Sequence, residues 1–77
     1  MARPQGQPQM LPVDSSSIER IGYVGYDREL YIEFRNGRLY VYEGVPAWVH
    51  VELLQAGSRG SYLNTEIKPN HAYRHVT

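Results

Sequence analysis

The chain has no cysteine among its 77 residues, which excludes a disulfide framework and any metal site built on thiolates. Basic and acidic side chains number eight each, so no net field draws the whole surface toward nucleic acid or an anionic membrane. No apolar run approaches the roughly 20 residues of a membrane span, and the N-terminus lacks the apolar segment of a signal peptide. These absences predict one small cytoplasmic domain without a membrane segment.

The arrangements that carry catalysis are also missing from the sequence. There is no glycine-rich phosphate loop and no cluster of zinc-type ligands. His71 and His75 have the spacing of two ligands on one helical face, but Pro69 argues against a helix there. His50 has no evident serine or cysteine partner. We therefore expect no enzymatic activity, no catalytic residue, no metal and no cofactor.

The strongest structural signal is a β-hairpin over residues 30–42, whose arms alternate in character and are rich in aromatic and β-branched residues. Asn-Gly at residues 36–37 suits the positive φ angles of a tight turn. A two-residue turn sets Ile32 opposite Val41 and leaves the tyrosines of the second arm outside. A three-residue loop with a glycine bulge sets Ile32 opposite Tyr40 and turns those tyrosines toward the core. The alternation by itself slightly favours the two-residue turn, and both registers remain open.

Residues 1–12 combine proline, glutamine and glycine with almost nothing to bury, so we expect a disordered N-terminal tail of open role. Residues 13–77 then form a single domain. Its first strand is predicted over residues 18–24, where Gly22 marks a bulge or the close approach of another segment.

Pro46 opens a predicted helix that continues to about Ala56, because a proline in the first turn lacks only an N–H that would be unpaired anyway. A second short helix is predicted over residues 58–68, with Ser58 or Ser61 as its N-cap. The expected fold is α+β: a three-stranded antiparallel sheet in the order β-β-β, followed by one or two short helices packed on one face.

Two large apolar residues fall on the outer side of the first predicted helix. Trp48 and Val51 lie away from the arc that should cover the sheet, and exposed apolar groups often mark an interface. The competing interpretation, in which Trp48 folds over the sheet edge and completes the core, remains equally open. With Tyr26 in the first turn and Ile18 in the first strand, these residues form the predicted protein-binding surface of a monomer.

Seven tyrosines interleaved with arginines suggest a second kind of surface. Sheet-surface modules hold single-stranded nucleic acid by stacking bases on aromatic rings while basic side chains contact phosphates. The candidate RNA-contacting residues are Tyr31, Arg35, Arg38, Tyr42, Arg59, Lys68 and Arg74.

The order of motifs along the chain resembles the KTSC domain, a family named for the C-terminus of certain lysyl-tRNA synthetases and also found as short stand-alone proteins. The motifs are Leu30-x-Ile32-x-Phe34, Tyr40-x-Tyr42, Val45-Pro46, Ser58-x-Gly60 and Tyr62-Leu63-Asn64. The resemblance implies no established activity, and RNA binding has only been suggested for the family. Members often carry a polar residue where this chain has Val41, which favours the bulged register. Trp48 and residues 24–26 are less polar than in the family pattern, which favours a protein partner.

Two functional hypotheses follow. In the first, the chain is a small non-catalytic module that binds a protein of the gene-expression machinery, such as RNA polymerase, as short bacterial and phage regulators do. In the second, it is an RNA-binding module associated with translation or tRNA.

Overall fold

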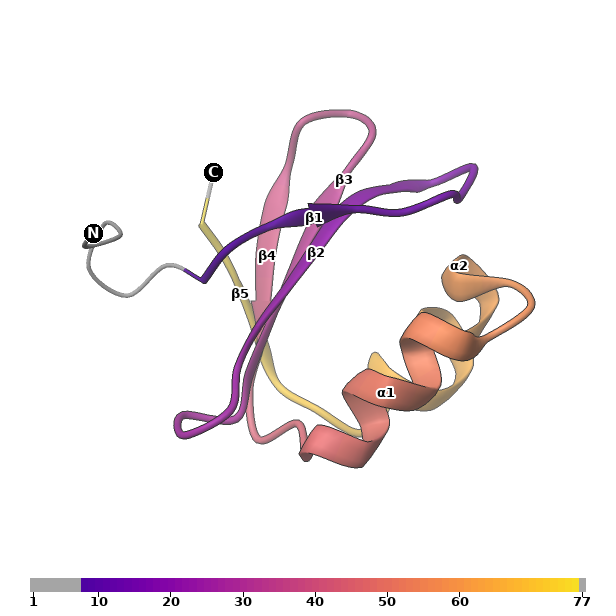
Figure 1. The fold of residues 1–77 in the computed structure, drawn as a ribbon. Helices are drawn as coiled ribbons and strands as arrows, with labels where there is room; N and C mark the ends of the chain where they lie inside the picture. The colour runs from indigo at the N-terminus through magenta and orange to yellow at the C-terminus, as the bar shows by residue number, and fades with distance from the viewer. Residues whose placement is uncertain (1–7, 77) are drawn as a thin grey trace.

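A computed structural model describes residues 8–76, and its strands form one five-stranded antiparallel sheet in the order β1-β2-β3-β4-β5. Figure 1 shows the helices together on one side of this sheet, with the β3–β4 turn extending beyond them. Within the described residues, no helix combines the length and apolar content needed to cross a membrane. The elements are β1 (Leu11–Pro12), β2 (Ile18–Val24), β3 (Glu29–Phe34), β4 (Leu39–Tyr42), α1 (Ala47–Gln55), α2 (Arg59–Tyr62), the π-helical turn η1 (Leu63–Ile67) and β5 (Tyr73–His75).

The predicted α+β class is confirmed, but the prediction of three strands was wrong. The predicted strands correspond to β2, β3 and β4, whereas β1 and β5 add one strand at each edge. β1 contains only two residues and β5 only three, so neither carries enough alternation to be recognised from the sequence. β5 exists because the chain returns from η1 to pair Tyr73 with Tyr42 on β4.

Residues 8–12 were expected to belong to a disordered tail, but in the structure they lie on the sheet. Leu11 pairs with Ile21 on β2, and Pro8 is buried. A methyl group added at Gly22 would lie 2.6 Å from Met10 Sδ and 2.8 Å from Pro8 Cγ. Gly22 therefore permits the close approach of this segment, which is one of the two roles predicted for it. Residues 1–7 lie outside the described part of the chain.

The hairpin adopts the bulged register. Leu30 faces Tyr42, and the Phe34 N–H donates to the Arg38 carbonyl at 2.9 Å around a three-residue loop. Gly37, at the end of this loop, has φ +89°, a conformation that favours glycine. The slight preference of the alternation for the two-residue turn was wrong, because β4 is buried on both faces. Tyr42 enters the core beneath the helices, while Val41 is buried on the opposite face of the sheet.

The helices cover the β2–β3–β4 part of the sheet. α1 buries Val49 and Leu53, and η1 buries Leu63 and Ile67, all within one core cluster. The predicted second helix is present as α2 followed directly by η1. Ser58 is its N-cap, with the side chain accepting from the Ser61 N–H.

Candidate functional site

The outer side of α1 carries an exposed apolar pair. The Trp48 side chain is 62% exposed and Val51 is 48% exposed. They lie three residues apart on one helical face, opposite Val49 and Leu53, which contact the core. The interpretation of Trp48 as part of the core was therefore wrong, and the α1 outer face (Trp48 and Val51) is open to a partner.

A groove of about 340 Å³ runs between this face and η1. Its rim carries the exposed carboxylates of Glu52 and Glu66. The Tyr62 hydroxyl donates to Glu52 Oε1 at 2.9 Å, and burial together with this bond raises the pKa of Tyr62 to about 12. Glu52 and Glu66 are the two acidic side chains that line the groove. The sequence analysis missed these glutamates, although Glu52 follows Trp48 by four residues and so shares its helical face. The groove is lined by Gly44, Pro46, Trp48, Val49, Glu52, Tyr62, Glu66, Asn70 and His71.

The other two predicted protein-contact residues behave differently. Tyr26, in the turn between β2 and β3, is 92% exposed. This turn contacts the loop before α1, because the Val45 N–H donates to the Arg28 carbonyl at 2.9 Å. Ile18 is fully buried in the core and cannot touch a partner, so its assignment was wrong. The outer edge of β2 is already paired with β1 and is not open to an extended peptide.

The predicted RNA-contacting tyrosines do not form a stacking surface. Tyr31 and Tyr42 lie on opposite faces of the sheet, and each is at most 5% exposed. Burial, together with the neighbouring Tyr40 and Tyr73 hydroxyls, raises the pKa of Tyr42 to about 12. Neither ring offers a face on which a base could stack.

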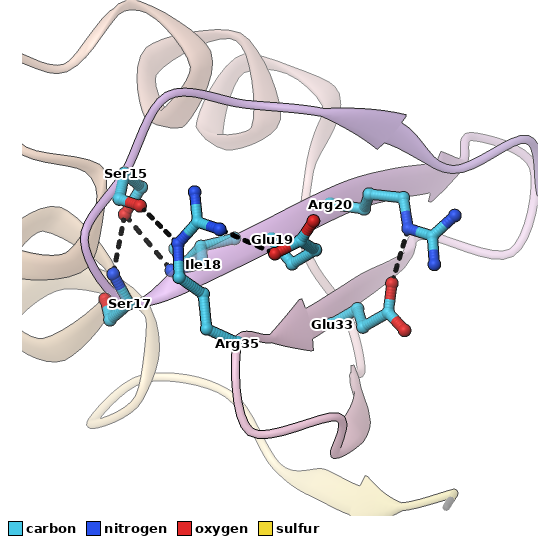
Figure 2. Close-up of polar contacts among 7 residues, drawn as sticks. All are labelled: Ser15, Ser17, Ile18, Glu19, Arg20, Glu33 and Arg35. Carbon is cyan, nitrogen blue, oxygen red and sulfur yellow. Dashed lines mark hydrogen bonds and ion pairs between the residues drawn. The ribbon is translucent and has the colours of Figure 1, made fainter.

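Two of the four predicted phosphate-contacting arginines, Arg35 and Arg74, already have acidic partners. Figure 2 shows Arg35 reaching across from the hairpin to β2, where its guanidinium lies 2.6 Å from Glu19 and donates to the Ser15 carbonyl at 2.8 Å. Arg74 contacts Glu43 at 2.6 Å and Glu29 at 3.3 Å. These exposed pairs add little stability, but they reduce the positive charge available to an RNA backbone.

Arg59 stabilises the fold. Its guanidinium donates to the Asp14 carbonyl at 3.1 Å and to the Leu54 carbonyl at 2.8 Å, so it joins the N-terminal loop to the end of α1. The remaining two candidates, Arg38 and Lys68, line a separate pocket on the sheet. The structure therefore does not bring the seven predicted RNA contacts together.

The histidines occupy three different surroundings. The His50 ring stacks on Tyr23 with 4.5 Å between centroids, and burial lowers the pKa of His50. His71 Nδ1 lies 3.1 Å from the Glu43 carbonyl, while His75 stacks on Tyr40. Among residues 8–76, no three histidine or acidic side chains gather as a metal site requires.

The architecture defines a small α+β domain whose antiparallel sheet is covered on one face by short helices. The sequence model of the KTSC domain matches residues 14–73, and the chain belongs to that family.

Relatives of similar length support the assignment. A protein of Stutzerimonas stutzeri is 43% identical over 63 residues, covering 82% of this chain and 87% of its own. A protein of Tsukamurella paurometabola is 42% identical over 60 residues, covering 78% and 90% respectively. The crystal structure of the KTSC domain protein YPO2434 from Yersinia pestis is similar with a TM-score of 0.87 and 37% identity. That similarity covers 92% of this chain and 100% of the other.

Several motifs that carry the family resemblance serve the fold in this structure. Ser58 caps α2, and a methyl group added at Gly60 would lie 2.7 Å from Ser17 Oγ. The Val45 carbonyl accepts from the Tyr23 hydroxyl at 2.6 Å. These residues explain why the chain folds as a KTSC domain, so a function particular to this chain is better sought in its exposed residues.

Proposed function

We propose that this chain is a non-catalytic binding module that acts on the gene-expression machinery by binding a protein, with RNA polymerase as the first candidate. The observation that supports the proposal is the 62% exposure of Trp48 beside Val51 on the α1 outer face. Tyr26, in the turn joined to the loop before α1, extends the proposed contact surface.

The energetics of Trp48 favour a contact. A tryptophan side chain can bury up to about 250 Å², so roughly 150 Å² of this one faces water. At ~25 cal/mol per Å², burying that area in an interface contributes at most about 4 kcal/mol. Tryptophan is also among the residues most often found to dominate the energetics of protein interfaces.

The groove beside Trp48 indicates the chemistry of the partner. Glu52 and Glu66 place two carboxylates at its rim. A partner that inserts an apolar side chain next to Trp48 and directs a lysine or arginine toward these glutamates would match both features.

The assignment to gene expression rests on the small size of the chain and on a sequence without a catalytic constellation. Short bacterial and phage regulators that modulate a large enzyme have these features. RNA polymerase is such an enzyme and is the first partner to test.

An affinity capture from a bacterial lysate, read by mass spectrometry, tests the proposal. The wild-type chain should recover RNA polymerase subunits, and Trp48→Ala should lose them. Leu11→Ala is the matched control, because Leu11 is 55% exposed but lies on β1, at the edge of the sheet. Equal recovery of the same proteins by the wild type and Trp48→Ala would contradict the proposed surface. Loss with both variants would mean that the contact is not confined to α1.

A further inference from the structure

A second pocket lies on the face of the sheet that the helices cover, at β4 and β5. Its volume is about 330 Å³, within the range of small-ligand sites. The pocket is lined by Phe34, Asn36, Arg38, Tyr40, Tyr42, Lys68 and Tyr73.

Aromatic rings form the floor of this pocket. The Tyr40 ring centroid lies 5.6 Å from that of Phe34 in an edge-to-face arrangement, and 5.4 Å from that of Tyr73. Tyr42, on the core side, supports Tyr73 from 5.7 Å. Tyr73 itself is 60% exposed, so much of its surface is accessible to a flat ligand. The neighbouring rings hold that surface in place before any ligand arrives.

The charge at this pocket has one sign. Arg38 and Lys68 line it, and no carboxylate does. In the described part of the chain, neither cation has a carboxylate within 4.0 Å, in contrast to Arg20, Arg35 and Arg74. Lys68 Nζ instead lies 5.7 Å from the centroid of the Phe34 ring. Two cations without acidic partners at the edge of an aromatic floor attract an anionic group joined to a planar ring.

We propose that this pocket binds a nucleotide, with the base against Tyr73 and Phe34 and a phosphate between Arg38 and Lys68. Stacking on aromatic side chains is tolerant of base identity, because every base has a π-face. The site is separate from the α1 outer face, so it is a second activity beyond the proposed protein contact. A free mononucleotide and one unit of a single-stranded chain share this chemistry.

Asn36 adds a polar group at the rim. Its Oδ1 accepts from the Arg38 backbone N–H at 3.0 Å, which fixes the side-chain amide within the hairpin loop. The amide nitrogen is then positioned to donate to an acceptor on the ligand. This arrangement favours a base with exposed acceptors over an unsubstituted aromatic ring.

An NMR titration of the full ¹⁵N-labelled chain distinguishes the contributions of base and phosphate. The probes are adenosine monophosphate, adenosine and inorganic phosphate, added separately. Adenosine monophosphate should shift the amides of residues 38–42 and 73–75, and it should bind more tightly than either of the other probes. Shifts confined to the α1 amides, or no shift of the amides of residues 38–42 and 73–75 with either adenosine monophosphate or a single-stranded hexanucleotide, would overturn the proposal.

Fluorescence anisotropy with a labelled hexauridylate tests whether the pocket binds one nucleotide of a single-stranded chain. On a single strand, Arg38 and Lys68 can each neutralise one of two neighbouring phosphates, which gives a salt slope of about −1.4, or roughly sevenfold weaker binding between about 50 and about 200 mM salt. Arg38→Gln combined with Lys68→Gln should remove this slope. Arg20→Gln, which deletes a positive charge paired with Glu33 on the opposite face, should retain it. Binding that is equally salt-dependent in both variants would refute the site.

Tyr73→Ala tests the aromatic floor. Removing one base-stacking side chain should weaken binding between about fivefold and about 150-fold, while circular dichroism shows an unchanged fold. Binding by the hexamer alone, or by the mononucleotide alone, would support the site and identify the source. Binding of an acidic tyrosine-containing peptide in preference to every nucleotide would overturn the assignment.

Discussion

Gly22→Ala should release the N-terminal segment from the sheet. The added methyl group would lie 2.6 Å from Met10 Sδ, 2.8 Å from Pro8 Cγ and 3.0 Å from the Gln9 carbonyl oxygen. Met10 can rotate away, but the proline ring and the backbone carbonyl have less freedom, so the segment must lift. Overpacking of this kind typically lowers the free energy of unfolding by about 1–3 kcal/mol. The lower conformational entropy of the unfolded alanine variant offsets roughly 0.4–1 kcal/mol of that loss.

The expected net loss is about 1–2 kcal/mol, which for a domain of this size lowers Tm by roughly 4–16 °C. Hydrogen exchange should show Leu11 losing protection before the rest of the sheet. Gly25→Ala is the matched control, because its methyl group would meet only Tyr23, at 3.7 Å. If Gly22→Ala melts at or above the wild-type temperature with Leu11 still protected, the account of β1 is refuted.

Three further predictions concern the hairpin turn at Gly37, the partly buried ring of His50 and the hydrogen bonds of Arg59. Gly37→Ala should lower the free energy of unfolding, measured by chemical denaturation, by about 1–2 kcal/mol, because φ is +89° at this position. Gly37→Asn should lose less, since asparagine tolerates this region. Equal losses in the two variants would contradict the bulged turn. Burial lowers the pKa of His50 below its unfolded value of 6.5. Below pH 6.5 the unfolded state therefore binds more protons at this residue than the folded state does, and the folded state loses stability as the pH falls. Urea midpoints between about pH 7 and pH 5 should therefore fall less in His50→Gln than in the wild type, and parallel curves would refute this. Arg59→Met should lower the urea midpoint, because the Asp14 and Leu54 carbonyls lose the guanidinium that donates to them. An unchanged midpoint would contradict the stabilising role of Arg59.

The sequence predicted the central elements because their signals were local. The strand at residues 18–24, the hairpin and the helix beginning near Pro46 each carry a period or a turn signal of their own. Gly22 was predicted to mark a bulge or a close approach, and the structure shows the close approach, by Met10 and Pro8. The hairpin register could not be decided from alternation, because Val41 and Tyr42 are both buried, on opposite faces.

The remaining features depend on contacts between distant segments. β5 forms only when η1 returns the chain to β4, and no short motif encodes that return. The same limitation affected the candidate sites. Arg74 was expected to be available to RNA, but it meets Glu29 from another strand, and Ile18 was assigned to an interface although the helices bury it. Trp48 and Val51 were placed correctly because the helical period alone determines which side of α1 they occupy.

The most direct test of the central claim measures Trp48→Ala in two ways, by affinity for purified RNA polymerase and by Tm. If the α1 outer face is the docking surface, the affinity should fall by about 30-fold or more, the loss of roughly 2 kcal/mol expected of a dominant interface residue. The Tm should change by only a few degrees, because the side chain is 62% exposed and leaves little cavity. A stability loss of about 3–5 kcal/mol, or unchanged affinity in a stable variant, would contradict the account.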